Sequence, residues 1–290
     1  MIQSMTGFGK VTAEFPEKKV TVELKALNSK QFDLSTRIPS VYKEMEMQIR
    51  SQLLVALERG KVDFSVQIEY IGKNIPTQLN QSVLENYFLQ IKSVADKLGI
   101  DPPADWFQVL LRMPEVIKNE ITEMDESEWA VVQQTIDQAI KQLRDFRIQE
   151  GRMLQKLFIQ KIENIGSLLK EIEKYEGERI EKIKARIMEN LEKVVSTDYD
   201  KNRFEQEMIY YIEKLDVNEE KNRLLNHLKY FVSTMESGQG QGKKLGFIVQ
   251  EIGREINTLG SKSNHAEMQQ IVVQMKDELE QMKEQILNVL

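Results

Sequence analysis

Apolar and polar positions alternate along much of the first seventy residues, as they do in strands that bury one face. Residues 19–26 place Val, Leu and Ala on one face and charged or hydroxyl side chains on the other, and residues 62–70 repeat this pattern. Between them, apolar positions recur at helical spacing over 41–57, with Ser40 in position to cap the helix and Gly60 to follow its end. The pattern predicts a sheet that one helix covers.

From Asn80 the apolar positions follow a helical period almost to the end of the chain. A helix over 83–98 should end at Gly99, before two consecutive prolines, and a short helix should follow at 106–111. Strands followed by helices in this way indicate the fold class α+β, with segregated elements.

A long helical tract begins at Ser127 or a neighbour and continues to Ile172 without a proline. Its length predicts an extended helix that turns after Gly177 and returns as an antiparallel partner over 180–195. Two further helices are predicted within 202–235. We therefore expect a β-containing N-terminal domain (1–125), a long antiparallel helical hairpin (126–200) and a C-terminal helical domain that carries the candidate active site (201–290).

The clearest helical period lies in residues 242–262, GKKLGFIVQEIGREINTLGSK. Its apolar residues form one stripe for a core: Leu245, Ile248, Val249, Ile252, Ile256 and Leu259. Two polar lines lie beside each other on the rest of the helix: Gln250, Arg254, Asn257 and Ser261, and then Glu251, Glu255, Thr258 and Lys262. Because two glutamates at i, i+4 repel, we expect a cation beside Glu251 and Glu255, namely Arg254, Lys262 or a metal ion. A solvated surface is the alternative, but Asn, Thr and Ser are modest helix formers, which favours a face selected for contacts.

The helix predicted before this one carries a second group of candidate residues. Glu220, Arg223 and His227 fall on one line along its flank. Helices joined by a short loop normally pack, so these groups would converge with Glu251 and Arg254. A lone histidine beside an apolar face is usually structural, but this spacing makes His227 a better site candidate.

The loop SGQGQGKKLG, residues 237–246, is not the phosphate-binding loop of ATPases. Ser237 stands where the first glycine is required, and Lys244 stands in the Ser/Thr position. The loop is nevertheless cationic and glycine-rich at a helix N-terminus, which favours an anion such as a backbone phosphate. A flexible connector is the alternative.

Composition limits the available chemistry. The chain has 290 residues and no cysteine, which excludes disulfides, thiolate nucleophiles and Cys-ligated metal, and leaves carboxylates, two histidines and hydroxyls. A net charge of −6 argues against indiscriminate nucleic-acid binding but is compatible with a local basic groove. With no apolar run of membrane-spanning length and no signal peptide at the start, we expect a cytoplasmic protein without a membrane partner.

Several segments together resemble the YicC-like endoribonuclease family of bacteria. They are SMTGFG (4–9), ELKALNSKQFDLSTRIP (23–39), RGKV (59–62), MPEVI (113–117), EGRML (150–154), KKLGFIVQEIGREINTLGSK (243–262) and EQILNV (284–289). The resemblance covers essentially the whole chain and implies a cytoplasmic, metal-dependent RNA endonuclease that forms a ring-like homohexamer around its substrate. The chain departs from the family pattern at His265, where an aspartate is frequent, and at Leu290, where a glutamate is common.

Phosphodiester hydrolysis assisted by a divalent cation, Mg²⁺ or Mn²⁺, is the first hypothesis. A metal ion held by carboxylates lowers the pKa of its bound water and neutralises charge on the phosphate. The catalytic candidates are His227, Arg223, Arg254 and Glu251; the candidate metal ligands are Glu207, Glu220, Glu251 and Glu255; the candidate RNA contacts are Lys25, Asn28, Lys30, Arg37, Lys243, Lys244 and Lys262.

Two alternatives remain open at this stage. In a metal-free ribonuclease, His227 would take the proton of the 2′-hydroxyl group. In a non-catalytic RNA-binding or scaffold protein, the polar lines would connect subunits, which the net negative charge and the long helices also fit. A homo-oligomer is expected in either case, a hexamer by the resemblance, because a closed ring collects the same few cations from every subunit around RNA.

Overall fold

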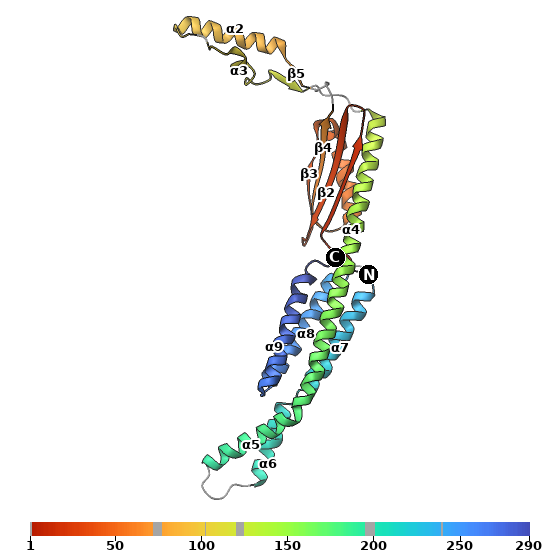
Figure 1. Ribbon diagram of the computed structural model, residues 1–290, viewed down its shortest axis with the longest axis vertical. Helices are drawn as coiled ribbons and strands as arrows, with labels where there is room; N and C mark the ends of the chain where they lie inside the picture. Colours follow the sequence, from red (N-terminus) through yellow and green to blue (C-terminus); the bar gives the residue numbers. More distant parts are fainter. Residues whose placement is uncertain (1, 72–76, 102, 120–124, 195–200, 239) are drawn as a thin grey trace. The chain divides into compact units, whose positions relative to one another are not determined.

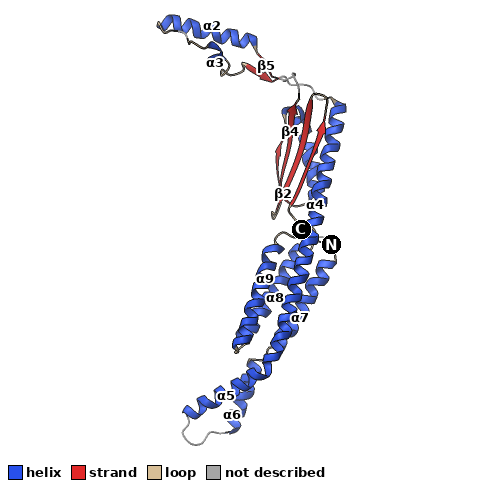
Figure 2. Ribbon diagram, viewed as in Figure 1, coloured by secondary structure: helices blue, strands red, loops and turns tan. Residues whose placement is uncertain are grey.

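The computed structural model describes residues 2–71, 77–101, 103–119, 125–194, 201–238 and 240–290 (Figure 1). The chain forms two compact units: a sheet unit of residues 8–25 and 32–143, and a helical unit of residues 1–7, 26–31 and 144–290. Strands and helices are segregated, which confirms the α+β class (Figure 2). No helix in the described ranges is both long and apolar enough to cross a membrane.

The boundary between the two units differs from the three predicted segments. It lies at residues 143 and 144, inside the long helix α4 (Glu126–Ile172). The first part of α4 packs in the sheet unit, whereas the rest packs in the helical unit with the C-terminal helices. The residues predicted to form a separate hairpin are therefore shared between the two units.

The sheet unit contains a four-stranded sheet with the strand order β1-β2-β4-β3. The strands are β1 (Gly7–Glu14), β2 (Lys18–Leu27), β3 (Phe32–Arg37) and β4 (Gly60–Tyr70). The two predicted strands are confirmed as β2 and β4. β3 was not predicted, and it runs parallel to β4 with Phe32 opposite Gly60. Six residues are too short an alternation to be recognised without knowledge of the pairing partner.

One face of this sheet is buried and the other is open. Helix α1 (Glu46–Leu57) buries Ile49, Leu53 and Leu57, and α4 buries Ile136 and Leu143 in the same unit. A hydrogen bond from Gln52 Nε2 to Asp137 Oδ1 (2.5 Å) joins these two helices. The alternating polar residues of the strands remain on the open face.

The predicted cap at Ser40 is wrong. Ser40 lies inside a 3-10 helix (Ser40–Met45), and α1 begins only at Glu46, without a side-chain cap. Because the Tyr42 N–H donates to the Pro39 carbonyl oxygen (3.0 Å), the backbone itself closes the first turn.

Residues 77–119, here called the insertion, contain two helices and a short two-stranded ribbon. Helix α2 (Gln81–Leu98) and helix α3 (Trp106–Leu110) confirm the prediction for this region. The Asn80 side chain caps α2 by accepting from Val83 N, and Gly99 ends it with a φ of +63°. The ribbon of β5 (Thr77–Leu79) and β6 (Ile117–Asn119) was not predicted, because each strand has only three residues.

The helical unit packs the second part of α4 with α7 (Asn218–Glu236), α8 (Gly242–Lys262) and α9 (Ala266–Ile286) around one apolar core. Phe158 of α4 packs edge-on against Phe231 of α7 (5.6 Å between ring centroids), while Lys221 reaches Glu176 just beyond α4. Higher residue numbers in α4 therefore meet lower ones in α7, so these two helices are antiparallel.

The prediction that residues 180–195 return antiparallel along the long helix is wrong. Those residues form α5 (Glu176–Val194), which follows a short 3-10 helix (Glu173–Tyr175) and precedes α6 (Lys201–Lys214). Lys182 of α5 lies beside His265 at the turn between α8 and α9 instead of back along α4. The apolar face of α4 is occupied by the C-terminal helices, which leaves no place there for α5.

Segments from both ends of the chain meet in the helical unit. Ser4 pairs with Val289 in an isolated β-bridge, and the Met5 N–H donates to the Asn288 carbonyl oxygen (2.8 Å). Thr6 donates to the Glu150 carboxylate, and any side chain at Gly151 would overlap the backbone of residues 2 and 3. Three of the segments that resemble the family, SMTGFG, EGRML and EQILNV, are thereby packed together.

Candidate functional site

Helix α8 has the boundaries predicted from the sequence, and its six predicted stripe residues are all buried. The opposite side carries the polar candidates. Arg254 Nη1 donates to Glu251 Oε1 (2.7 Å) on the same helix, and the Arg254 side chain is 72% exposed. Thr258 and Ser261 donate to backbone carbonyl oxygens one turn earlier, so they cap the helix's own carbonyls instead of extending the site.

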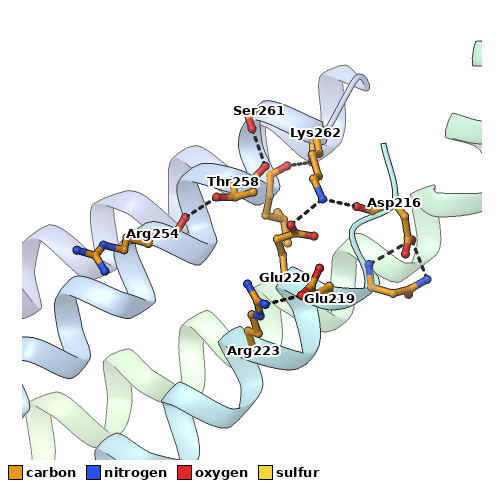
Figure 3. A network of polar contacts seen from close by, with 11 residues as sticks. Asp216, Glu219, Glu220, Arg223, Arg254, Thr258, Ser261 and Lys262 are labelled. Atoms are coloured by element: carbon orange, nitrogen blue, oxygen red, sulfur yellow. Dashed lines mark hydrogen bonds and ion pairs between the residues drawn. The ribbon is translucent and has the colours of Figure 1, made fainter. Parts of the chain in front are cut away.

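Lys262 joins α8 to α7 (Figure 3). Its Nζ lies 2.7 Å from Glu220 Oε1 and donates to the Asp216 carbonyl oxygen at 3.0 Å. The Glu220 side chain is only 6% exposed, and its second oxygen, Oε2, has no hydrogen-bond partner in the described part of the chain. The cation predicted beside Glu251 and Glu255 is therefore found for Glu251, where it is Arg254, while Lys262 pairs instead with Glu220 of the neighbouring helix.

Replacing Lys262 with methionine should destabilise the helical unit by about 1–3 kcal/mol, because a nearly buried carboxylate loses its charged partner. Urea denaturation followed by circular dichroism measures the change. The double variant Glu220→Gln with Lys262→Met should regain part of the loss, since an amide carries no charge to leave uncompensated. A wild-type midpoint for Lys262→Met would mean that the ion pair contributes nothing to stability.

The α7 candidates are placed beside α8 but do not contact Glu251 or Arg254. Arg223 forms its ion pair with Glu219 one turn earlier on its own helix, and His227 has no hydrogen bond or ion pair among the described residues. The Glu220–Lys262 pair and the stacking of Lys244 over Tyr230 (5.0 Å) define an antiparallel register for the two helices. In this register His227 lies at the same height along the helices as Glu251 and Arg254. The backbone positions are therefore neighbours as predicted, but the side chains do not meet.

The four candidate metal ligands do not form a preassembled site. The Glu207 side chain lies outside the described residues, although its helix, α6, is described. Glu220 pairs with Lys262 and Glu251 pairs with Arg254, whereas Glu255 is buried without a hydrogen bond or ion pair in the described chain. Within the described ranges, no three acidic or histidine side chains are grouped as metal ligands would be.

The glycine-rich loop ends where α8 begins. Gly238 and Gly240 adopt positive φ angles of +141° and +72°, which only glycine takes readily. Gly242 lies against the backbone of Val289, and its N–H donates to the Leu290 carbonyl oxygen (3.4 Å). One of the N–H groups expected to bind an anion is therefore used inside the protein, while Lys243 and Lys244 stay exposed.

Two of the four N-terminal RNA candidates lie together in the sheet unit. Lys25 and Arg37 line one hollow on the open face of the sheet, with Glu23, Ser35, Asp63, Phe64 and Ser65. Lys25 pairs with Glu23, and this hydrogen bond lowers the pKa of the Glu23 carboxyl group. The Lys25 Nζ also lies 5.9 Å from the ring centroid of Phe8. The other two candidates, Asn28 and Lys30, are exposed and belong to residues 26–31 of the helical unit.

His265 was set aside in the sequence, but it occupies a buried position at the start of α9. Its Nε2 lies 3.1 Å from Lys182 Nζ, and its Nδ1 lies 2.9 Å from Glu267 Oε2. The hydrogen bond to Glu178 raises the pKa of Lys182, so this amine is a cation that donates to the ring. His265 thus links α5 to the bundle, a structural role that its departure from the family pattern did not reveal.

Comparison with known proteins identifies the family. Residues 2–156 match the family described as the N-terminal region of YicC-like endoribonucleases, and residues 172–290 match its C-terminal region. The chain belongs to the YicC-like endoribonuclease family. A protein of Clostridioides difficile (strain 630) and one of Haemophilus influenzae (strain ATCC 51907 / DSM 11121 / KW20 / Rd) are each 30% identical to it, over 295 and 297 residues. Both are named "Probable endoribonuclease YicC", and both matches cover all of this chain and all of the relative.

Proposed function

We propose that this protein is an endoribonuclease that hydrolyses phosphodiester bonds of RNA. The observation that carries the proposal is the full-length match to two relatives named as probable endoribonucleases. Because the match spans both family regions, the sheet unit and the helical unit are both retained. The basic and acidic side chains of α8 belong to the part of the chain that the C-terminal region covers.

We assign to Arg254 the role of binding the scissile phosphate. A guanidinium group has five N–H donors in a planar fork that suits phosphate oxygens. In the described chain only Nη1 is engaged, by Glu251, so the other donors remain available to a ligand. Glu251 orients the guanidinium group, and the exposed Lys243 and Lys244 add positive charge at the beginning of the same helix.

We also propose that a divalent cation, Mg²⁺ or Mn²⁺, assists the reaction. When bound, such an ion supplies a water of lowered pKa and offsets charge that develops on the phosphate. The donor chemistry fits, because Glu220 Oε2 has no hydrogen-bond partner in the described chain and the buried Glu255 supplies a second carboxylate. Further ligands would come from Glu251, Glu207 or another subunit.

RNA would reach this site in the cytoplasm, within a homo-oligomer that we take to be a hexameric ring. A chain with a net charge of −6 must gather its cations to hold RNA, and several copies around one cavity do this. Lys25 and Arg37 on the open sheet face would contribute to the path of the RNA, together with Asn28 and Lys30.

A metal-free reaction is the second candidate, and one observation favours it. The register of α7 and α8 places His227 level with Arg254. His227 would then accept the proton of the 2′-hydroxyl group, whose oxygen attacks the neighbouring phosphorus. The bond from phosphorus to the 5′-oxygen of the next nucleotide breaks, this oxygen takes up a proton and leaves as a 5′-hydroxyl, and the other strand end keeps a 2′,3′-cyclic phosphate.

Cleavage of a structured RNA with and without EDTA should separate these candidates. We expect EDTA to abolish cutting, added Mn²⁺ or Mg²⁺ to restore it, and the products to lack a 2′,3′-cyclic phosphate. Undiminished cutting in EDTA, with products that end in a 2′,3′-cyclic phosphate, would favour the metal-free reaction with His227 as the base. RNA binding without any cutting by the purified protein would favour a non-catalytic RNA-binding role.

A further inference from the structure

Helix α8 exposes one aromatic ring, Phe247, on its polar side. Phe247 is 58% exposed, whereas the six stripe residues of the same helix are buried in the core. Among the described residues, Phe247 takes part in no ring–ring or cation–ring contact. Packing within the helical unit therefore does not explain this side chain, and its surroundings on the surface have to.

Phe247 lies on the same side of α8 as Arg254, to which we assign the scissile phosphate. The two residues are seven positions apart, which is close to two full turns, so their side chains leave the helix in directions only about 20° apart. Two turns rise by about 10 Å. At roughly 3.4 Å per stacked nucleotide, a strand whose phosphate is bound at Arg254 brings a base within about three nucleotides to Phe247.

Cations and a second aromatic ring lie beside Phe247. Lys243, one turn earlier, and Lys244 are both exposed, and residues 242–250 of α8 contain no acidic side chain. Lys244 Nζ lies 5.0 Å from the ring centroid of Tyr230 on α7, which is 48% exposed. This contact places Tyr230 beside the same stretch of α8. Exposed rings among cations are typical of surfaces that bind single-stranded RNA, where the cations hold phosphates and the rings stack on bases.

RNA fits this surface better than a protein partner does. A phenylalanine side chain buries roughly 150–250 Å², whereas a stable protein contact needs about 800 Å² on each partner. Lysine is depleted at the centre of such contacts, because its ammonium group must lose water there. A base stacked on Phe247 covers the ring alone and leaves Lys243 and Lys244 in water, where they reach phosphate oxygens.

We propose that Phe247 stacks on an unpaired base of the RNA, within about three nucleotides of the phosphate at Arg254. The inference rests on the proposed function and adds its substrate class. Both faces of a base inside a duplex are covered by its neighbours, so the RNA is single-stranded at this position. Tyr230 holds Lys244 beside it, where the ammonium group contacts an adjoining phosphate. Because every base has a π-face, the stacking requires an unpaired nucleotide but no particular sequence.

The first test measures binding of a fluorescently labelled single-stranded RNA to the full-length protein by anisotropy, with a gel to show that the strand is intact. Phe247→Ala should weaken binding by about 5–100-fold, whereas Phe247→Trp, which keeps a ring, should bind within about threefold of the wild type. Phe107→Ala is the matched control, because it removes a phenylalanine that is 69% exposed on α3 of the sheet unit. The control should bind as the wild type does, and every variant should keep the wild-type helical signal and sedimentation mass.

The second test removes the bases of the same RNA one at a time. At one abasic position the wild type should lose as much affinity as Phe247→Ala loses on the intact RNA, and there the variant should cause no further loss, because ring and base act as one contact. On the fully paired form of the RNA, the wild type and Phe247→Ala should bind equally.

Three results overturn the stacking: wild-type affinity of Phe247→Ala, an equal loss by this variant on every abasic RNA, or a changed sedimentation mass, which would make the ring a subunit contact. A loss by Phe247→Ala on the paired RNA as large as on the single strand overturns the substrate class. A wild type that binds RNA in the expected pattern but cuts none contradicts the proposed function and leaves the stacking in place. A wild type without affinity for RNA overturns both.

Discussion

Replacing Ile252 with aspartate should unfold the helical unit. Ile252 is completely buried in the core that α8 shares with α4, α7 and α9. Removing its aliphatic side chain costs about 2–5 kcal/mol, and burying a carboxylate without a partner adds several more. Since a typical domain is stable by about 5–15 kcal/mol, the two terms together remove most or all of that margin.

Thermal and urea denaturation followed by the helical circular dichroism signal measure this effect. Gln250→Asp is the matched control, because it adds the same side chain to an exposed position of the same helix two residues away. The control should melt close to the wild type. An Ile252→Asp protein that is soluble and melts with the control would mean that α8 packs through another face.

Replacing Arg254 with alanine should lower RNA cleavage by about 10²–10³-fold while the fold stays intact. The loss is expected in the rate of the chemical step, because in our proposal the guanidinium group stabilises the charge that develops on the phosphate. Stability should hold, since the side chain is 72% exposed and alanine is the best helix former.

Single-turnover cleavage at saturating enzyme and a melting curve together check this result. Lys276→Ala on α9 is the matched control, because it removes an exposed cation of the same unit that has no assigned role. We expect the control to cleave as the wild type does. Full activity of Arg254→Ala with normal melting would make Arg254 an ordinary surface residue and would shift the assignment to the remaining cations.

Local periodicity explains why some elements were predicted well. Helix α8 has the predicted bounds and the predicted buried stripe, because twenty-one residues of one period leave a single consistent face. The strands β2 and β4 were recognised for the same reason, with ten and eleven residues. The predicted end of α2 at Gly99 also depends only on neighbouring residues.

The candidate site was predictable in part. The sequence placed Glu220, Arg223 and His227 on one line of α7, and the packing of α7 on α8 brings that helix beside Arg254. It offered Arg254 as one possible cation beside Glu251, but it did not reveal that Arg223 pairs with Glu219 or that Lys262 pairs with Glu220. A basic side chain on a helix often has several acidic side chains within reach, on its own helix and on a neighbouring one. The sequence pattern does not show which of them it pairs with.

The sequence by itself determined the elements whose residues repeat with one period: the strands β2 and β4, the long helix α4, and α8 with its apolar stripe and polar faces. Only the tertiary structure decided the pairing of β3 with β4, the boundary inside α4, the departure of α5 from an antiparallel return, and the contacts of His265. The physical reason is that periodicity reports which face of an element seeks burial, whereas the partner of that face depends on how distant segments compete for it. On α2, for example, no residue is fully buried within the described chain.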